Sequence, residues 1–149
     1  MGMVFQKNIP KLDSTFQKTM KTSVATVPAT LTEINGWMVS SGVRPETITN
    51  VQIVLAEALN NIVEHGFKHQ KNGHVDINID LSEAAIVVRL TDDGVAFTPP
   101  EVEQSPLRDK NDLDNLPEGG FGWFLIRKIT SYYEFHRLNG KNYLLLKFQ

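Results

Sequence analysis

The chain contains no cysteine among its 149 residues. Disulfide bonds and thiolate metal sites are therefore excluded, and a reducing compartment, the cytoplasm, is the expected location. No stretch reaches the roughly 18 consecutive apolar residues that a membrane-spanning helix needs, and the N-terminus lacks the apolar run of a signal peptide. The net charge is only −2, so nothing in it favours nucleic acid. Neither a membrane nor a nucleic acid is an expected partner.

The length of 149 residues predicts a single domain, because a domain commonly contains about 100–200 residues. Residues 1–21 are polar and without clear periodicity, and we expect them to form an N-terminal arm. The folded domain is then expected over residues 22–149, with room for a strand within residues 22–30.

Two segments carry apolar residues at helical spacing. In the first, Thr30 and Glu33 match a capping box, and the helix is expected to end near Gly42. In the second, Pro45 suits the first turn, and an apolar stripe continues to about His65. The sequence therefore predicts two consecutive helices.

Alternation of apolar and polar residues predicts strands farther along the chain. Residues 74–81 and 84–91 indicate an antiparallel hairpin, and Asn139-Gly140 is typical of the turn in a second hairpin. Between the hairpins, residues 98–118 hold four prolines and six acidic residues, which indicates a functional or disordered loop before a third helix. This order of elements predicts an α+β fold, a two-layer sandwich with helices on one face of a mixed or antiparallel sheet.

Three polar residues interrupt the apolar second helix. Glu57, Asn61 and His65 stand at positions i, i+4 and i+8, so they share nearly one face. Polar groups on such a helix are costly without partners. The carboxylate and the carboxamide offer oxygens of the kind Mg²⁺ prefers, and a carboxylate can also accept a proton from a hydroxyl. The alternative is that all three lie at the edge of the stripe and point into water.

Two further segments place ligand-binding groups at the ends of regular elements. Asp92 ends a buried strand and Gly94 follows it, which can present a carboxylate to an amine; the alternative is an ordinary Asp-Gly turn. Gly119, Gly120 and Gly122 precede an apolar helix, whose first amides can bind an anion; the alternative is a flexible hinge. Together with the polar helix face, these groups match the metal, adenine and phosphate parts of Mg-ATP.

The segments LAEALNNIVEHGF, LTDDGVAFTP and EGGFGWFLIRKI resemble, in this order, the N, G1 and G2 boxes of the GHKL (Bergerat-fold) ATPases. They are similar in particular to anti-sigma factor serine/threonine kinases of the RsbW/SpoIIAB type, over residues 22–149. The resemblance implies that Glu57 is the general base, that Asn61 binds Mg²⁺ and that Asp92 recognises the adenine amino group.

The same resemblance implies further assignments around the nucleotide. Gly94 would be the companion glycine of Asp92, and His65 would have a supporting role. Residues 98–118 would form the ATP lid. The phosphate contacts would come from three glycines: Gly119, Gly120 and Gly122.

The function implied is that of an ATP-dependent kinase in a partner switch. Such a protein, commonly a homodimer, sequesters a sigma factor and phosphorylates a STAS-domain antagonist on serine or threonine. Ala96 and Trp123 depart from the usual glycine and leucine, and we expect Trp123 to be a core aromatic rather than to face the lid or a partner. Two other functions remain open: a nucleotide-binding interaction module without phosphoryl transfer, and an adaptor that binds no nucleotide.

Overall fold

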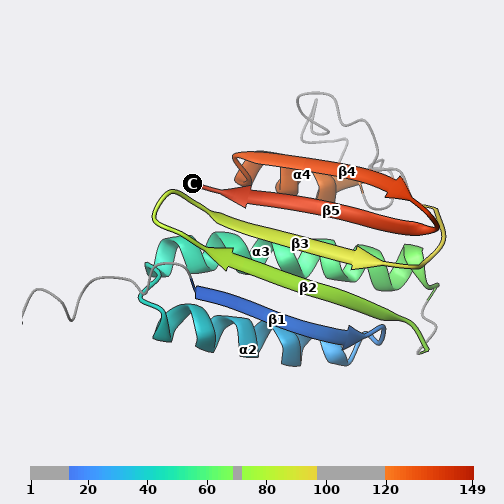
Figure 1. Cartoon of the computed structure of the whole chain (residues 1–149), viewed down its shortest axis with the longest axis horizontal. Helices are drawn as coiled ribbons and strands as arrows, with labels where there is room; N and C mark the ends of the chain where they lie inside the picture. The colour runs from blue at the N-terminus through green and yellow to red at the C-terminus, as the bar shows by residue number, and fades with distance from the viewer. Residues whose placement is uncertain (1–13, 69–71, 97–119) are drawn as a thin grey trace, which may run out of the picture.

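A computed structural model describes residues 14–68, 72–96 and 120–149. In these residues, three α-helices, a π-helical turn and five strands form two layers (Figure 1). The helical elements are α2 (Thr26–Ser40), α3 (Pro45–Asn61), the π-helical turn η1 (Ile62–Gly66) and α4 (Gly120–Ile129). The strands are β1 (Ser14–Lys21), β2 (His74–Leu81), β3 (Ile86–Asp92), β4 (Tyr132–Leu138) and β5 (Lys141–Phe148).

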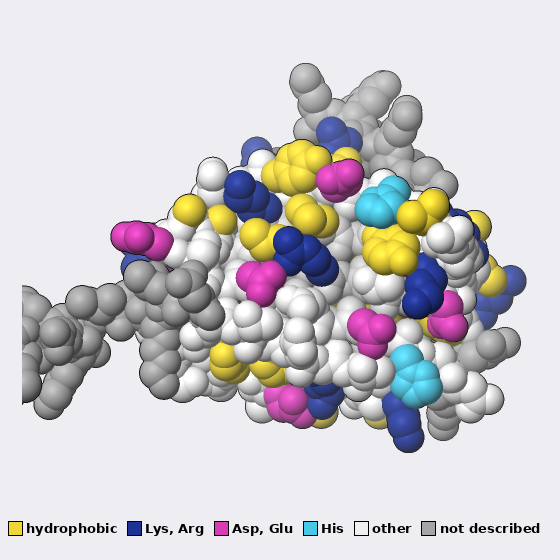
Figure 2. Space-filling model, in the orientation of Figure 1, with side chains coloured by type: hydrophobic (Ala, Val, Ile, Leu, Met, Phe, Trp, Pro, Cys, Tyr) yellow, Lys and Arg dark blue, Asp and Glu magenta, His cyan; other side chains and the backbone are white. Residues whose placement is uncertain are grey.

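The five strands form one fully antiparallel sheet in the order β1-β2-β3-β5-β4. The helices cover one face of this sheet (Figure 1), and the other face displays side chains of mixed type, with charges of both signs (Figure 2). The predicted two-layer α+β sandwich is therefore confirmed, and the sheet is antiparallel rather than mixed. None of the helices in the described part of the chain is long and apolar enough to cross a membrane.

The hydrophobic core lies between the sheet and the central helix α3. Alternate residues of the central strands face it and are buried: Val75, Ile77, Ile79, Leu81, Ile86, Val88 and Leu90. From α3, the buried apolar residues are Ile48, Val51, Val54, Leu55, Ala58 and Leu59. Each large buried side chain contributes about 1.5–3 kcal/mol. This packing fixes α3, so polar side chains on it are held at defined positions.

Strand β1 is the main difference between the predicted and the observed fold. Residues 14–21 lie within the expected N-terminal arm, yet they pair with β2 along their whole length. Lys18 is one of the alternate residues of β1 that face inward, and it is half-buried. Its ammonium group lies 2.6 Å from the carboxylate of Glu33 on α2. A lysine can bury its aliphatic stem in this way while its charge reaches solvent. The prediction of an irregular arm is therefore wrong for these residues, and residues 1–13 lie outside the described part.

Helix α2 also begins earlier than predicted, at Thr26, so no strand forms within residues 22–30. The Thr26 hydroxyl donates to the carbonyl oxygen of Lys21 at 2.6 Å, which ties the helix start to the end of β1. Thr30 is buried inside the helix. The predicted capping box at Thr30 is therefore wrong.

Three other predicted boundaries are confirmed. Helix α2 ends at Ser40, and Gly42 follows with a φ of 83°, the left-handed conformation that commonly ends a helix. Helix α3 begins at Pro45. Asn139 and Gly140 have φ angles of 52° and 77°, as a tight turn between β4 and β5 requires.

Candidate functional site

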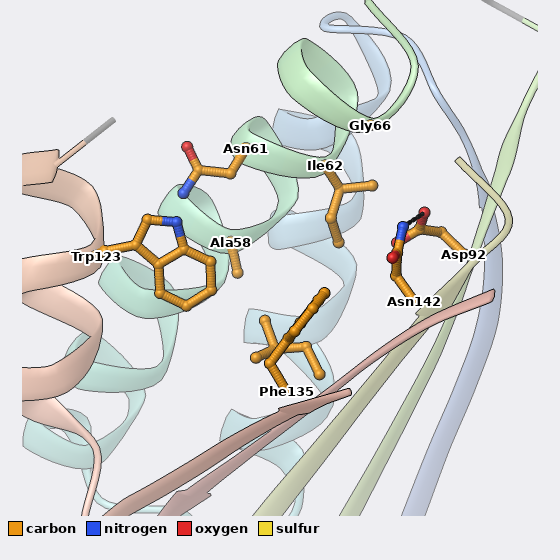
Figure 3. A pocket seen from close by; sticks show the side chains of 9 residues that line it. Ala58, Asn61, Ile62, Gly66, Asp92, Trp123, Phe135 and Asn142 are labelled. Carbon is orange, nitrogen blue, oxygen red and sulfur yellow. Dashed lines mark hydrogen bonds between the residues drawn. The ribbon is translucent and has the colours of Figure 1, made fainter. Parts of the chain in front are cut away.

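A pocket lies where α3 passes into η1, against the ends of β3 and β5. It is lined by Ala58, Asn61, Ile62, Gly66, Asp92, Trp123, Phe135, Asn142 and Leu144. Figure 3 shows Asp92 and Asn142 on one side of this pocket and Asn61 and Trp123 on the other. Two residues predicted from separate segments of the sequence, Asn61 and Asp92, therefore line a single pocket.

Asp92 is the last residue of β3 and is only 5% exposed. Its Oδ1 accepts hydrogen bonds from the backbone N–H of Gly94 at 2.9 Å and from Nδ2 of Asn142 at 3.0 Å. Within the described residues no group donates to Oδ2. Burial raises the pKa of Asp92 above its ordinary value of 3.8, and the two hydrogen bonds partly offset this rise. The arrangement leaves one carboxylate oxygen for a ligand donor such as an amino group.

Gly94 lets the chain after β3 cross closely over the end of η1. A Cβ atom at this position would lie 2.5 Å from the carbonyl oxygen of Gly66 and 2.9 Å from Oδ1 of Asp92. The next residue, Val95, donates its N–H to the same Gly66 carbonyl at 2.9 Å. Because the close atoms of Gly66 belong to the backbone, only glycine fits here. The crossing fixes the edge of the pocket against α3.

The end of α3 is not a plain α-helix as far as His65, as the sequence suggested. Its last turn, η1, is π-helical, and the N–H of Phe67 donates to the carbonyl of Ile62 at 3.2 Å. Single π-helical turns occur frequently at functional sites. Here the turn presents the carbonyl of Gly66 to the loop after β3.

Glu57 and Asn61 extend from α3 towards the first turn of α4. A Cβ atom on Gly122 would lie 2.6 Å from Oε2 of Glu57 and 3.7 Å from Nδ2 of Asn61. Asn61 is only 8% exposed, and its Nδ2 has no hydrogen-bond partner among the described residues. A buried amide without a partner costs about 1–3 kcal/mol. The Nδ2 of Asn61 is therefore available to donate a hydrogen bond to a ligand.

Glu57 and Asn61 on α3 carry oxygen atoms of the type that Mg²⁺ binds in a site that also holds a nucleotide. Among residues 14–68, 72–96 and 120–149, no group of three or more His, Cys, Asp or Glu could hold a metal. Mg²⁺ in nucleotide sites commonly takes only one or two protein oxygens together with substrate phosphates. The carboxamide oxygen of Asn61 is an oxygen of the type that could serve in such a site.

The other predicted site residues are less central. Gly120 is the first residue of α4 and Gly122 lies in its first turn, so glycines open this helix as expected. His65 is half-buried in η1 and does not line the pocket. Gly119 and the predicted lid, residues 98–118, lie outside the described residues.

Asn142 lines the pocket although it belongs to none of the predicted motifs. It is 4% exposed and is the one polar residue in the inward-facing series of β5, which also contains Leu144, Leu146 and Phe148. A single polar residue within this alternating apolar series was the sequence signal that could have indicated Asn142.

Trp123 is 3% exposed, and its ring centroid lies 6.3 Å from that of Tyr133. The prediction of Trp123 as a core aromatic is therefore confirmed.

Comparison with known proteins places these features in a family. A model described as the histidine kinase-like ATPase domain matches residues 20–148. The serine-protein kinase RsbW of Bacillus subtilis is 31% identical over 86 residues, which are 56% of this chain and 54% of that protein. The serine-protein kinase RsbW of Listeria innocua is 26% identical over 117 residues, 77% of this chain and 74% of that protein. The chain thus spans about half the length of the first relative.

A solved structure shares the fold. It contains the RsbU and RsbW domains of a Mycobacterium tuberculosis protein, and it matches with a TM-score of 0.65 at 13% sequence identity. The match covers 91% of this chain and 32% of the other. At this identity the similarity shows the fold alone.

Proposed function

The chain belongs to the histidine kinase-like ATPase domain family, and we propose that it is an ATP-dependent serine/threonine protein kinase and anti-sigma factor. In this proposal it sequesters a sigma factor in the cytoplasm, acts as a homodimer and phosphorylates a STAS-domain antagonist. The observation that carries the proposal is the pocket with Asp92 on one side and Asn61 on the other. Similarity to serine-protein kinases supports the choice of reaction.

The pocket residues suit the two ends of ATP. The open oxygen of Asp92 would accept a hydrogen bond from the adenine amino group. Asn61 would hold Mg²⁺, which neutralises phosphate charge when it is bound. The N-terminal end of α4, with Gly120 and Gly122, carries the partial positive charge of the helix dipole and would favour the phosphates. Phosphoryl transfer depends mainly on positioning and charge stabilisation, and these residues supply both.

Glu57 would act on the protein substrate. It is half-buried, one helical turn before Asn61, and lies against Gly122. In the proposed step, the Glu57 carboxylate accepts the proton of a serine or threonine hydroxyl. The hydroxyl oxygen forms a bond to the γ-phosphorus, and the bond from that phosphorus to the leaving oxygen of ADP breaks. General-base catalysis of this kind contributes about 10²–10⁴-fold to a rate.

The test is phosphate transfer from Mg-ATP to a STAS-domain protein. We expect the wild-type chain to transfer phosphate, and Glu57→Gln to lose about 100-fold or more in rate while ATP binding is retained. Glu64→Gln is the matched control, because Glu64 is exposed in η1. Wild-type activity in Glu57→Gln would disprove the role of Glu57. ATP binding by the wild type without transfer to any STAS partner would instead favour a non-catalytic nucleotide-binding module.

A further inference from the structure

A chain of hydrogen bonds beside the pocket links three neighbouring strands. In the sheet register, Arg137 of β4 pairs with Asn142 of β5, and Asn142 pairs with Asp92 of β3. The Arg137 guanidinium donates to Oδ1 of Asn142 at 2.9 Å and to the carbonyl of Gly94 at 3.0 Å. Nδ2 of Asn142 donates to Oδ1 of Asp92 and to the carbonyl of Val95, both at 3.0 Å.

These partners fix the orientation of the Asn142 amide. A guanidinium group can only donate hydrogen bonds, so the Asn142 atom that faces Arg137 must be the oxygen. The amide nitrogen must then face the carboxylate of Asp92 and the carbonyl of Val95, which are both acceptors. Reversal of the amide would place a donor against Arg137 and an acceptor against Asp92. Arg137, the Asp92 carboxylate and the Val95 carbonyl together require Asn142 to act as a donor towards Asp92, and Arg137 is the group that holds the amide oxygen on the opposite side.

The same hydrogen bonds make the two oxygens of Asp92 unequal. Oδ1 accepts from both Asn142 and the N–H of Gly94, and Figure 3 shows the bond between Asn142 and Asp92 beside the pocket. Oδ2 accepts from no described residue. A carboxylate held through one oxygen on two sides cannot turn freely. Its second oxygen is thus held in position for a ligand.

We propose that Arg137 and Asn142 are positioning residues that set the base specificity of the pocket. Asn142 holds the carboxylate of Asp92 in the orientation that accepts a hydrogen bond from a 6-amino group, and Arg137 holds Asn142. The assignment rests on the proposed function, because it requires Asp92 to bind the base. A 6-oxo purine would present an acceptor to this carboxylate and be rejected. A purine without any 6-substituent would lose only the hydrogen bond.

The position of Arg137 separates this role from a structural one. Its side chain is exposed on the edge strand β4, so its replacement leaves the apolar core intact and removes only the hydrogen bonds to Asn142 and Gly94. Lys141 is also exposed and directly precedes Asn142, but it has no part in this hydrogen-bond chain. Replacement of either residue by methionine removes one positive charge near the pocket. Lys141→Met is therefore a matched control for Arg137→Met.

The experiment measures, for the full chain with Mg²⁺, dissociation constants of ATP and of purine riboside triphosphate, which lacks the 6-amino group. A hydrogen bond to a charged group predicts that the wild type and Lys141→Met prefer ATP by about tenfold or more. In Arg137→Met and Asn142→Leu we expect this preference to fall to about threefold or less, through weaker ATP binding alone. Binding of the analogue should remain as in the wild type.

Two results would overturn the assignment. The first is that Arg137→Met prefers ATP over purine riboside triphosphate as strongly as the wild type does. The second is an equal loss of affinity for both nucleotides, which a structural or purely electrostatic role would produce. If Asn142→Leu does not fold, Arg137→Met alone tests the assignment. In both cases wild-type ATP binding leaves the proposed function standing, whereas a wild type that binds neither nucleotide contradicts both.

Discussion

Replacement of Gly122 by alanine tests the contact between α4 and Glu57. The added Cβ would lie 2.6 Å from Oε2 and 3.4 Å from Cδ of Glu57, and 3.7 Å from Nδ2 of Asn61. Non-bonded carbon atoms normally approach to about 3.5–4.0 Å, so the carboxylate must move. Because the closest atom is the end of a flexible side chain rather than backbone, Glu57 can turn aside while the helices keep their places.

The expected change in stability is small, because two effects oppose each other. Alanine in a helix is favoured over glycine by about 0.8–1.0 kcal/mol. Displacement of the Glu57 side chain from its preferred rotamer costs about 0.5–1.5 kcal/mol. The free energy of unfolding of Gly122→Ala should therefore differ from wild type by less than about 1 kcal/mol. The transfer rate should respond far more strongly, because a displacement of about 1 Å near a reacting group can cost about 100-fold.

Thermal unfolding and phosphate transfer to a STAS-domain protein would be measured for wild type, Gly122→Ala and Gly36→Ala. Gly36 is exposed in α2, and nothing lies within 4 Å of an added Cβ. We expect Gly36→Ala to gain about 0.8–1.0 kcal/mol in stability and to keep wild-type transfer. Gly122→Ala should keep its stability and lose about 100-fold in transfer. Wild-type transfer by Gly122→Ala would show that the position of the Glu57 carboxylate against α4 does not control phosphate transfer.

Three further substitutions test the fold and the pocket. Gly94→Ala should lower the free energy of unfolding by about 2 kcal/mol or more, because its Cβ would meet the Gly66 carbonyl at 2.5 Å; Gly66→Ala, with no contact nearer than 3.7 Å, should not. Urea unfolding compares the two. Asp92→Asn should stabilise the ligand-free chain at neutral pH, because burial raises the pKa of Asp92 and its ionised form is disfavoured. This gain should disappear below the unfolded pKa of 3.8, which urea unfolding at several pH values measures. Lys18→Met should change stability by less than about 1 kcal/mol, because its ion pair with Glu33 is solvent-exposed.

Elements with strong local signals could be predicted from the sequence. The start of α3 follows from Pro45, and the turn between β4 and β5 follows from Asn139-Gly140, since both depend on adjacent residues. Strand β1 could not be predicted in this way. Its partner β2 begins at His74, far along the chain, and Lys18 interrupts the apolar alternation on its inward face. This segment forms a strand only because it pairs with β2 and packs against α2.

The site was predictable where one segment carries the signal. The helical spacing indicated Asn61 together with Glu57 and His65, and the resemblance to the ATPase boxes assigned Asp92; the structure brings Asn61 and Asp92 to one pocket. The polar interruption at Asn142 could have marked that residue, but its role and that of Arg137 could not be predicted, because they depend on the register of β5 against β3 and β4. The close approach of Gly122 to Glu57 depends likewise on how α4 packs on α3.

Binding of ATP in the Asp92 pocket can be measured by thermal unfolding with and without Mg-ATP. The comparison needs wild type, Asp92→Asn and Asp93→Asn; Asp93 is the exposed neighbour and loses the same charge. Ligand at 100 times its dissociation constant stabilises a protein by about 2.7 kcal/mol. We predict this stabilisation for wild type and Asp93→Asn, and much less for Asp92→Asn at the same concentration. Equal stabilisation of Asp92→Asn, or no stabilisation of the wild type at millimolar nucleotide, would show that ATP does not bind through Asp92.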